Sequence, residues 1–163
     1  MSSASAVLTS PSVERVRQAL ERAGLATPIV ELPGAARTAK AAAEFLGCEV
    51  AQIANSLVFR AASSGRAVLV MSSGAKRVDV SRLSALLGEP AGKADAQFVR
   101  QHTGFAIGGV APAGHSLEKI FIERSLSAFD ELWAAAGHPH TVFRLTYPDL
   151  LRITGGAEAH LAA

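Results

Sequence analysis

The chain has 163 residues, 49% of them hydrophobic and 18% charged, with a formal net charge of +2 at pH 7. This composition excludes a disordered chain and predicts one compact domain with a hydrophobic core of its own. The longest aliphatic run, residues 67–71, is far too short to cross a bilayer, and the net charge is too small to indicate a nucleic-acid partner by itself.

Residues 1–10 have no basic start and no long apolar run, so we expect a flexible tail followed by a single domain over residues 11–163. Ser10-Pro11 starts the first helix, because serine can cap a helix and proline suits its first turn, and Gly24 ends it. The next elements are predicted to be a strand, a helix capped by Thr38, a hairpin of two strands and a loop: residues 28–32, 38–46, 56–60 with 67–71, and 72–77.

The second half of the chain shows the same alternation of strands and short helices. The predicted elements are a helix over residues 81–87, a helix capped by Asp95 and reaching residue 102, a buried strand over 105–107, a strand over 119–123, a helix from 127 to its end at Gly137, a strand over 141–145 and a helix over 147–154. Because this order lacks regular βαβ spacing and any repeat, it favours an α+β domain over a doubly wound sheet.

A glycine-rich loop follows the apolar residues 105–107. Gly108 and Gly109 have no side chains to shield their amides, so a ligand can approach this backbone closely. Pro112 stiffens the loop and Gly114 lets it turn again, which makes a binding lip of backbone donors. His115 closes the loop, where it can orient a water or bind a ribose hydroxyl. The alternatives are a tight connection between elements and a histidine that faces solvent.

The usual catalytic signatures are absent from the sequence, which contains no G-x-S-x-G, no Walker loop, no H-E-x-x-H and no C-x-x-C. Cys48 follows the end of a predicted helix, where the helix dipole raises the pKa of a thiol, so we interpret it as buried or incidental. As the single cysteine it also excludes an internal disulfide and is typical of a reducing cytoplasm. His138 and His140 flank a proline without an evident third ligand, so we expect no metal and no other cofactor.

Positive charge is concentrated in one stretch of the chain. Between residues 60 and 82 the basic side chains are opposed only by Asp79; they are Arg60, Arg66, Lys76, Arg77 and Arg82. A basic surface of this kind can meet phosphates, and the alternative is an ordinary solvated face.

Three segments together resemble the YbaK/prolyl-tRNA editing family of aminoacyl-tRNA deacylases. They are residues 47–59 (GCEVAQIANSLVF), residues 103–114 (TGFAIGGVAPAG), and residues 142–145 (VFRL) with Leu150 and 154–156 (TGG). The resemblance runs from about residue 28 to residue 156, in order and without a large insertion. It implies a mixed, barrel-like sheet with flanking helices in one domain, and a cytoplasmic enzyme that acts in trans. It also implies hydrolysis of mischarged tRNA, with proline tRNA carrying alanine, cysteine or 2-aminobutyrate as the expected substrate and prolyl-tRNA synthetase as a candidate partner.

The resemblance also implies how the reaction is catalysed. Members of this family use neither a metal nor a protein nucleophile, so catalysis depends on held geometry and on donors aimed at the developing oxyanion. Where the family usually has a lysine at the start of a strand, this chain has Asn55. The amide keeps the capacity for hydrogen bonds but loses the cation. This difference supports an alternative, a non-catalytic module that binds tRNA or a synthetase.

The family pattern predicts which residues form the site. Catalytic roles fall to Asn55, Gly108, Gly109 and His115. Substrate and tRNA contacts fall to the remaining candidates, which are Ser56, Ser73, Lys76, Arg77, Pro112 and Gly114. We expect Ser56, Ser73, Gly108, Gly109, Gly114 and His115 to surround one cleft. Lys76 and Arg77 are expected to restore positive charge and to contact tRNA phosphates. The sequence gives no indication of oligomeric state.

Overall fold

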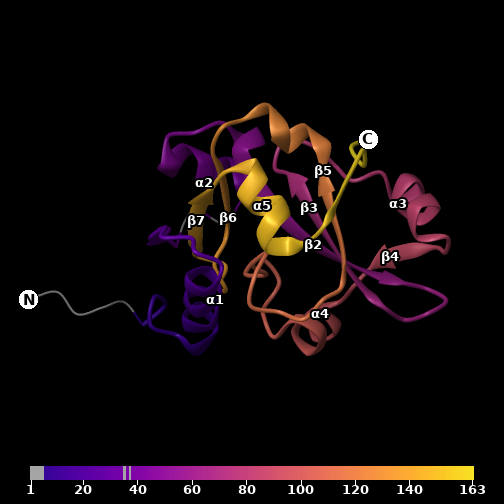
Figure 1. Ribbon diagram of the computed structural model, residues 1–163, viewed down its shortest axis with the longest axis horizontal. Helices are drawn as coiled ribbons and strands as arrows, with labels where there is room; N and C mark the ends of the chain where they lie inside the picture. Colours follow the sequence, from indigo (N-terminus) through magenta and orange to yellow (C-terminus); the bar gives the residue numbers. More distant parts are fainter. Residues whose placement is uncertain (1–5, 35, 37) are drawn as a thin grey trace, which may run out of the picture.

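The computed structural model describes residues 6–34, 36 and 38–163, and this part of the chain forms one α+β domain. Five α-helices and eight strands alternate along it (Figure 1). The helices are α1 (Pro11–Arg22), α2 (Ala39–Leu46), α3 (Val80–Leu87), α4 (Ala96–Thr103) and α5 (Tyr147–Thr154). The strands are β1 (Ile29–Glu31), β2 (Ile53–Ala61), β3 (Ala67–Ser73), β4 (Ala91–Lys93), β5 (Lys119–Glu123), β6 (Leu132–Ala135), β7 (Thr141–Leu145) and β8 (Ala157–Ala159). Two short 3₁₀ helices, η1 (Val50–Gln52) and η2 (Arg124–Ala128), precede β2 and follow β5.

The strands form one mixed sheet in the order β1-β7-β6-β2-β3-β5-β8, with β4 paired to β2 outside this path. The β2–β3 hairpin is antiparallel, whereas β6 joins β2, and β5 joins β3, in parallel. The two ends of the path, β1 and β8, are not paired with each other in the described structure. The sheet is therefore mixed, as predicted, but open rather than a closed barrel.

Helices cover both faces of the sheet. On one face the core joins Leu69 and Met71 of β3 to Leu20 of α1, Val99 of α4 and Leu150 of α5. On the other face two smaller clusters pack under α3 and α2. One contains Val68, Val70 and Leu83, and the other contains Ala42, Ile53 and Val142. Every residue of β3 is buried, because this central strand is covered from both sides.

Local hydrogen bonds explain where most helices begin and end. Thr38 and Asp95 cap α2 and α4, as predicted, since their side chains accept hydrogen bonds from Ala41 N–H and Phe98 N–H. Glycines in the left-handed conformation end both helices. Ser10 precedes α1, as predicted, but its hydroxyl donates to Val7 O at 2.9 Å instead of capping the helix. The predicted tail thus falls partly outside the described residues, and residues 6–10 form hydrogen-bonded turns.

Two predicted elements were wrong. Residues 105–107 form a turn rather than a strand, because Phe105 N–H donates to the Thr103 hydroxyl at 3.0 Å and Gly109 N–H donates to Ala106 O at 2.9 Å. The helix predicted from residue 127 to Gly137 is instead η2 followed by β6, in which buried and half-buried residues alternate. Its Leu132 lies opposite Leu145 of β7, so pairing with β7 overrides the helical spacing of the apolar residues.

None of the helices in the described ranges combines the length and the hydrophobicity that a bilayer crossing requires.

Candidate functional site

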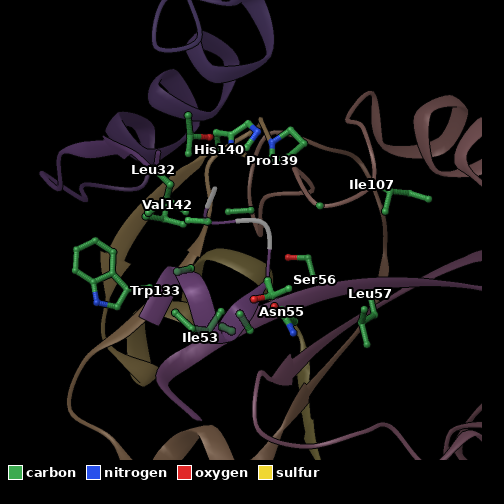
Figure 2. Close-up of a pocket in the computed structure, with 18 residues that line it drawn as sticks. Leu32, Ile53, Asn55, Ser56, Leu57, Ile107, Trp133, Pro139, His140 and Val142 are labelled. Atoms are coloured by element: carbon green, nitrogen blue, oxygen red, sulfur yellow. The ribbon is translucent and has the colours of Figure 1, made fainter. Parts of the chain in front are cut away.

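A pocket opens where β2 separates from β6. The two strands pair only through Ile53 and Ala54 of β2, and β4 joins β2 only from Phe59 onward. Between these points, residues 55–58 have no strand partner on the edge away from β3 in the described structure. A pocket of about 550 Å³ lies against this edge, within the range of about 300–1,000 Å³ that is typical of small-molecule sites (Figure 2).

Apolar side chains make up most of the pocket wall. Leu32, Ile53 and Val142 belong to the core cluster under α2, so this wall is continuous with the interior of the protein. Trp133 of β6 lines one side, and Figure 2 shows Asn55 and Ser56 between it and Leu57. The polar lining residues are Thr38, Asn55, Ser56, His140 and Thr141. No Asp, Glu, Lys or Arg is among the described lining residues.

Asn55 and Ser56 present different kinds of polar group to this pocket. The Ser56 hydroxyl donates to the Met71 sulfur at 3.3 Å, which fixes it against the core. The Asn55 amide lines the pocket and has no hydrogen-bond partner among the described residues. Its oxygen and its two N–H donors are therefore available to a ligand.

Two loops meet at the opposite wall, which Gly108, Pro139 and His140 line. A Cβ on Gly109 would lie 2.9 Å from the backbone Cα and C of His138, so only glycine allows this close approach. His140 N–H donates to the Nδ1 atom of His138 at 3.0 Å, and the Nδ1 atom of His140 is buried without a partner in the described structure. Burial, together with nearby His140, holds the pKa of His138 below its usual value despite Glu31, which suits an imidazole that accepts a hydrogen bond.

A smaller pocket of about 230 Å³ adjoins the first, and both are lined by Ser56, Leu57, Ile107 and Gly108. Leu57 and Ile107 are 38% and 55% exposed, which is high for large apolar side chains, so they form an apolar ledge between the two pockets. Lys93 of β4 lines the smaller pocket. Among the described residues that line either pocket, it is the single Lys, Arg, Asp or Glu.

His115 and Gly114 lie outside the lining of both pockets, beside Arg15 of α1. The Arg15 guanidinium donates to Gly104 O at 3.0 Å and lies 4.3 Å from the centre of the Phe105 ring, so it holds the start of the glycine loop. His115 Nδ1 accepts a hydrogen bond from Leu117 N–H, which leaves the proton of the neutral ring on Nε2. Burial, and then the charge of Arg15, lowers the pKa of His115.

The remaining predicted site residues also lie away from the pocket lining. Ser73 is buried, and its hydroxyl donates to Ala51 O at 3.1 Å. Gly109 lies where the two loops approach each other, and Pro112 is buried. Lys76 and Arg77 are exposed on the loop after β3. Of the predicted residues, the structure therefore brings Asn55, Ser56 and Gly108 together around one pocket.

Sequence reasoning missed Thr38, Trp133, His140 and Lys93 as lining residues. Trp133 had been assigned to a helix, and the single residue Lys93 in a short strand carries no motif. The sequence interpretation of His140 is a residue at the entry to a strand, without a metal. In the described part of the chain, no group of three or more His, Cys, Asp or Glu side chains is arranged to hold a metal ion. Cys48 is half-buried, and burial, with Glu49, raises the pKa of its thiol.

The pocket of this α+β domain is lined by an amide, hydroxyls and a free backbone edge. Among the described residues of this site, no serine hydroxyl is hydrogen-bonded to a histidine, so a serine–histidine nucleophile is not assembled. Residues 34–153 match the family model of the aminoacyl-tRNA editing domain, and the chain belongs to this family.

Three known proteins are similar to this chain. A solved structure described as a candidate trans-editing enzyme for prolyl-tRNA synthetase is 44% identical, with a TM-score of 0.88 over 94% of this chain and 98% of that one. A scaffold protein used for epitope grafting is 42% identical, with the same TM-score, over 94% of this chain and 99% of its own. An uncharacterized protein of Bacillus subtilis (strain 168), YwhH, is 26% identical over 140 residues, which are 85% of this chain and 88% of YwhH.

Proposed function

We propose that the protein is a trans-editing aminoacyl-tRNA deacylase that hydrolyses the ester of mischarged tRNA. The expected substrate is proline tRNA carrying a small non-cognate residue such as alanine, cysteine or 2-aminobutyrate. The observation that carries the proposal is the Asn55 amide, which has no hydrogen-bond partner among the described residues and lies on a strand edge in a pocket that Gly108 also lines. Membership of the editing family, and the similarity to a candidate trans-editing enzyme for prolyl-tRNA synthetase, support it.

In the proposed reaction a water attacks the ester carbonyl, the bond to the ribose oxygen breaks, and that oxygen leaves with a proton. The Asn55 amide can donate to the carbonyl oxygen as negative charge develops on it, and the exposed backbone of Gly108 can add a second donor. His140 is the titratable side chain among the described lining residues of the larger pocket, so it is the protein group available to orient the water. The hydroxyls of the terminal adenosine are the alternative proton carriers.

The apolar pocket wall supports selection of small amino acids. One methylene group is worth only about 1–3 kcal/mol in a synthetase pocket, so a synthetase benefits from a second site that removes the smaller products. A protein with this role works where tRNA is charged, and the single cysteine agrees with a reducing cytoplasm.

A deacylation screen tests the proposal. The protein is mixed in excess with proline tRNA charged with alanine, cysteine, serine, 2-aminobutyrate or, as the cognate control, proline, and single-turnover rates are compared with buffer. Hydrolysis of a non-cognate ester well above the buffer rate, and its loss in Asn55→Ala, supports the deacylase. Rates equal to buffer for every ester overturn it.

The second candidate is a non-catalytic tRNA- or synthetase-binding module, which the replacement of the family lysine by Asn55 favours. Trp133 is the single tryptophan of the chain and lines the larger pocket, so its fluorescence reports occupancy without turnover. A saturable change in fluorescence with charged tRNA, together with no hydrolysis, favours the module.

A further inference from the structure

An exposed stack of planar side chains lies beside the smaller pocket. The Arg60 guanidinium carbon is 5.4 Å from the centre of the Phe98 ring, and the Phe98 and His102 rings are 4.1 Å apart with a tilt of 35°. Arg60 comes from β2, whereas Phe98 and His102 are one helical turn apart on α4 (Figure 1). Arg60 and His102 are exposed and Phe98 is half-buried, so this stack presents flat surfaces to solvent.

Lys93 connects this stack to the pockets. It lies opposite Phe59 in the β2–β4 pair, one position from the pairing of Arg60 with Gly92. It also lines the smaller pocket together with Val99, the neighbour of Phe98. The Lys93 ammonium is exposed and has no ion-pair partner among the described residues. We call Arg60, Lys93, Phe98 and His102 the α4–β4 surface.

Acidic groups near this surface are already engaged. The Asp95 carboxylate caps α4 by accepting a hydrogen bond from Phe98 N–H at 2.8 Å. Glu89 accepts hydrogen bonds from the Ser63 and Ser64 N–H groups and lies 3.7 Å from Arg66. Arg60 and Lys93 are thus the cations of the α4–β4 surface, and the oxygens of the neighbouring Asp95 and Glu89 carboxylates are held by backbone N–H groups.

We propose that the α4–β4 surface binds the unpaired nucleotides at the 3′ end of an RNA. Bases of single-stranded RNA stack on aromatic rings and guanidinium planes, and lysines contact their phosphates. A duplex hides the faces of its bases, so it cannot use this stack. The inference rests on the proposed function, in which the terminal aminoacylated nucleotide occupies the pockets. The nucleotides before it then pass Lys93 and reach the Arg60–Phe98–His102 stack.

The test measures binding of a fluorescein-labelled RNA tetranucleotide, ACCA, by anisotropy over a range of salt concentrations. Phe98→Leu keeps an apolar side chain but removes the ring, and we expect it to weaken binding about 5- to 100-fold with the salt dependence unchanged. Lys93→Ala is expected to weaken binding and to reduce the slope of log affinity against log salt by about 0.7, the value for one phosphate of a single strand. Lys93→Arg should restore both.

Arg22→Ala is the matched control, because Arg22 is an exposed arginine on α1 that lines neither pocket. Melting curves followed by circular dichroism verify that each variant is folded. If Phe98→Leu unfolds, His102→Ala replaces it, because this variant removes the second ring of the stack at an exposed position and should also weaken binding. Equal affinities and slopes for wild type, Lys93→Ala and Phe98→Leu overturn the proposal. Equal competition by a blunt RNA hairpin also overturns it, because a duplex would then be the ligand.

The outcome separates this inference from the proposed function. If the protein binds ACCA through Lys93 and Phe98 but hydrolyses no aminoacyl ester, the RNA-binding role of the α4–β4 surface is supported and the deacylase function is refuted. If it hydrolyses an aminoacyl-tRNA and both Lys93→Ala and Phe98→Leu keep wild-type kcat/KM and ACCA affinity, the deacylase function is supported and the RNA-binding role of the surface is refuted.

Discussion

Replacing Gly109 with alanine tests whether the contact between two loops shapes the larger pocket. The new Cβ would lie 2.9 Å from the Cα and C atoms of His138 and 3.0 Å from its nitrogen. Carbon atoms prefer separations of about 3.5–4.0 Å, so the two backbones must move apart by about 0.5–1 Å. We expect the free energy of unfolding to fall by about 1–3 kcal/mol, as for other overpacked sites. Because Gly108 and His140 line the pocket from these loops, the single-turnover rate should fall by up to about 100-fold.

Urea unfolding and single-turnover deacylation of the best ester from the screen measure these effects. Gly92→Ala is the stability control, because no atom lies within 4 Å of the Cβ it would add. It should unfold like wild type. If Gly109→Ala matches wild type in both stability and rate, the approach of the two loops does not position the pocket. A loss of stability without a loss of rate would show that the contact serves folding alone.

Four further predictions concern charge and hydrogen bonding. Asn55→Ala should slow single-turnover hydrolysis by about 10²- to 10³-fold, as for loss of one oxyanion donor, and an unchanged rate would show that the amide takes no part in the reaction. Asn55→Lys should fold normally and tighten tRNA binding. Neutralising Lys76 and Arg77 together should weaken binding of all tRNAs and flatten its salt dependence, and an unchanged slope would assign them to a solvated face. The low pKa of His115 means that the unfolded chain binds more protons just below pH about 6.5, so stability should fall as the pH drops through that range. His115→Gln should weaken this dependence in denaturant melts at several pH values, and the part that remains is expected from His138, whose pKa is also lowered. Glu123→Gln should cost about 1–3 kcal/mol of stability, measured at neutral pH, because the amide turns a donor toward one of the N–H groups that the carboxylate binds; wild-type stability would contradict this.

The elements that could be predicted from the sequence are those with local signals. Thr38 and Asp95 were recognised as helix caps because the hydrogen bond forms within three residues. The β2–β3 hairpin was predicted because a short turn joins two apolar runs. In contrast, β4 and β8 are three residues each and exist only through partners far along the chain, so no local pattern indicates them. The helix predicted over residues 127–137 is wrong because the spacing of Phe129, Leu132 and Trp133 fits a helix as well as it fits the observed strand β6.

The candidate site was predictable only where it coincides with a family motif. Asn55, Ser56 and Gly108 lie in such motifs and line the larger pocket. His115 is indicated by its place at the end of the glycine loop, but the charge of Arg15 that helps to lower its pKa comes from about one hundred residues earlier in the chain. Lys93 lines the smaller pocket because β4 pairs with β2, and the sequence does not reveal this pairing.

The sharing of one wall between the pocket and the core has a consequence for how substrate preference can evolve. Ala135 lines the pocket, is half-buried and belongs to none of the core clusters, so a larger side chain at this position would narrow the pocket at little cost in stability. Widening it requires truncation of Leu32, Ile53 or Val142, which are core residues. Truncation of a buried leucine or isoleucine to alanine costs about 2–5 kcal/mol, a large share of a typical stability. Drift in this lineage should therefore run toward smaller ligands more readily than toward larger ones.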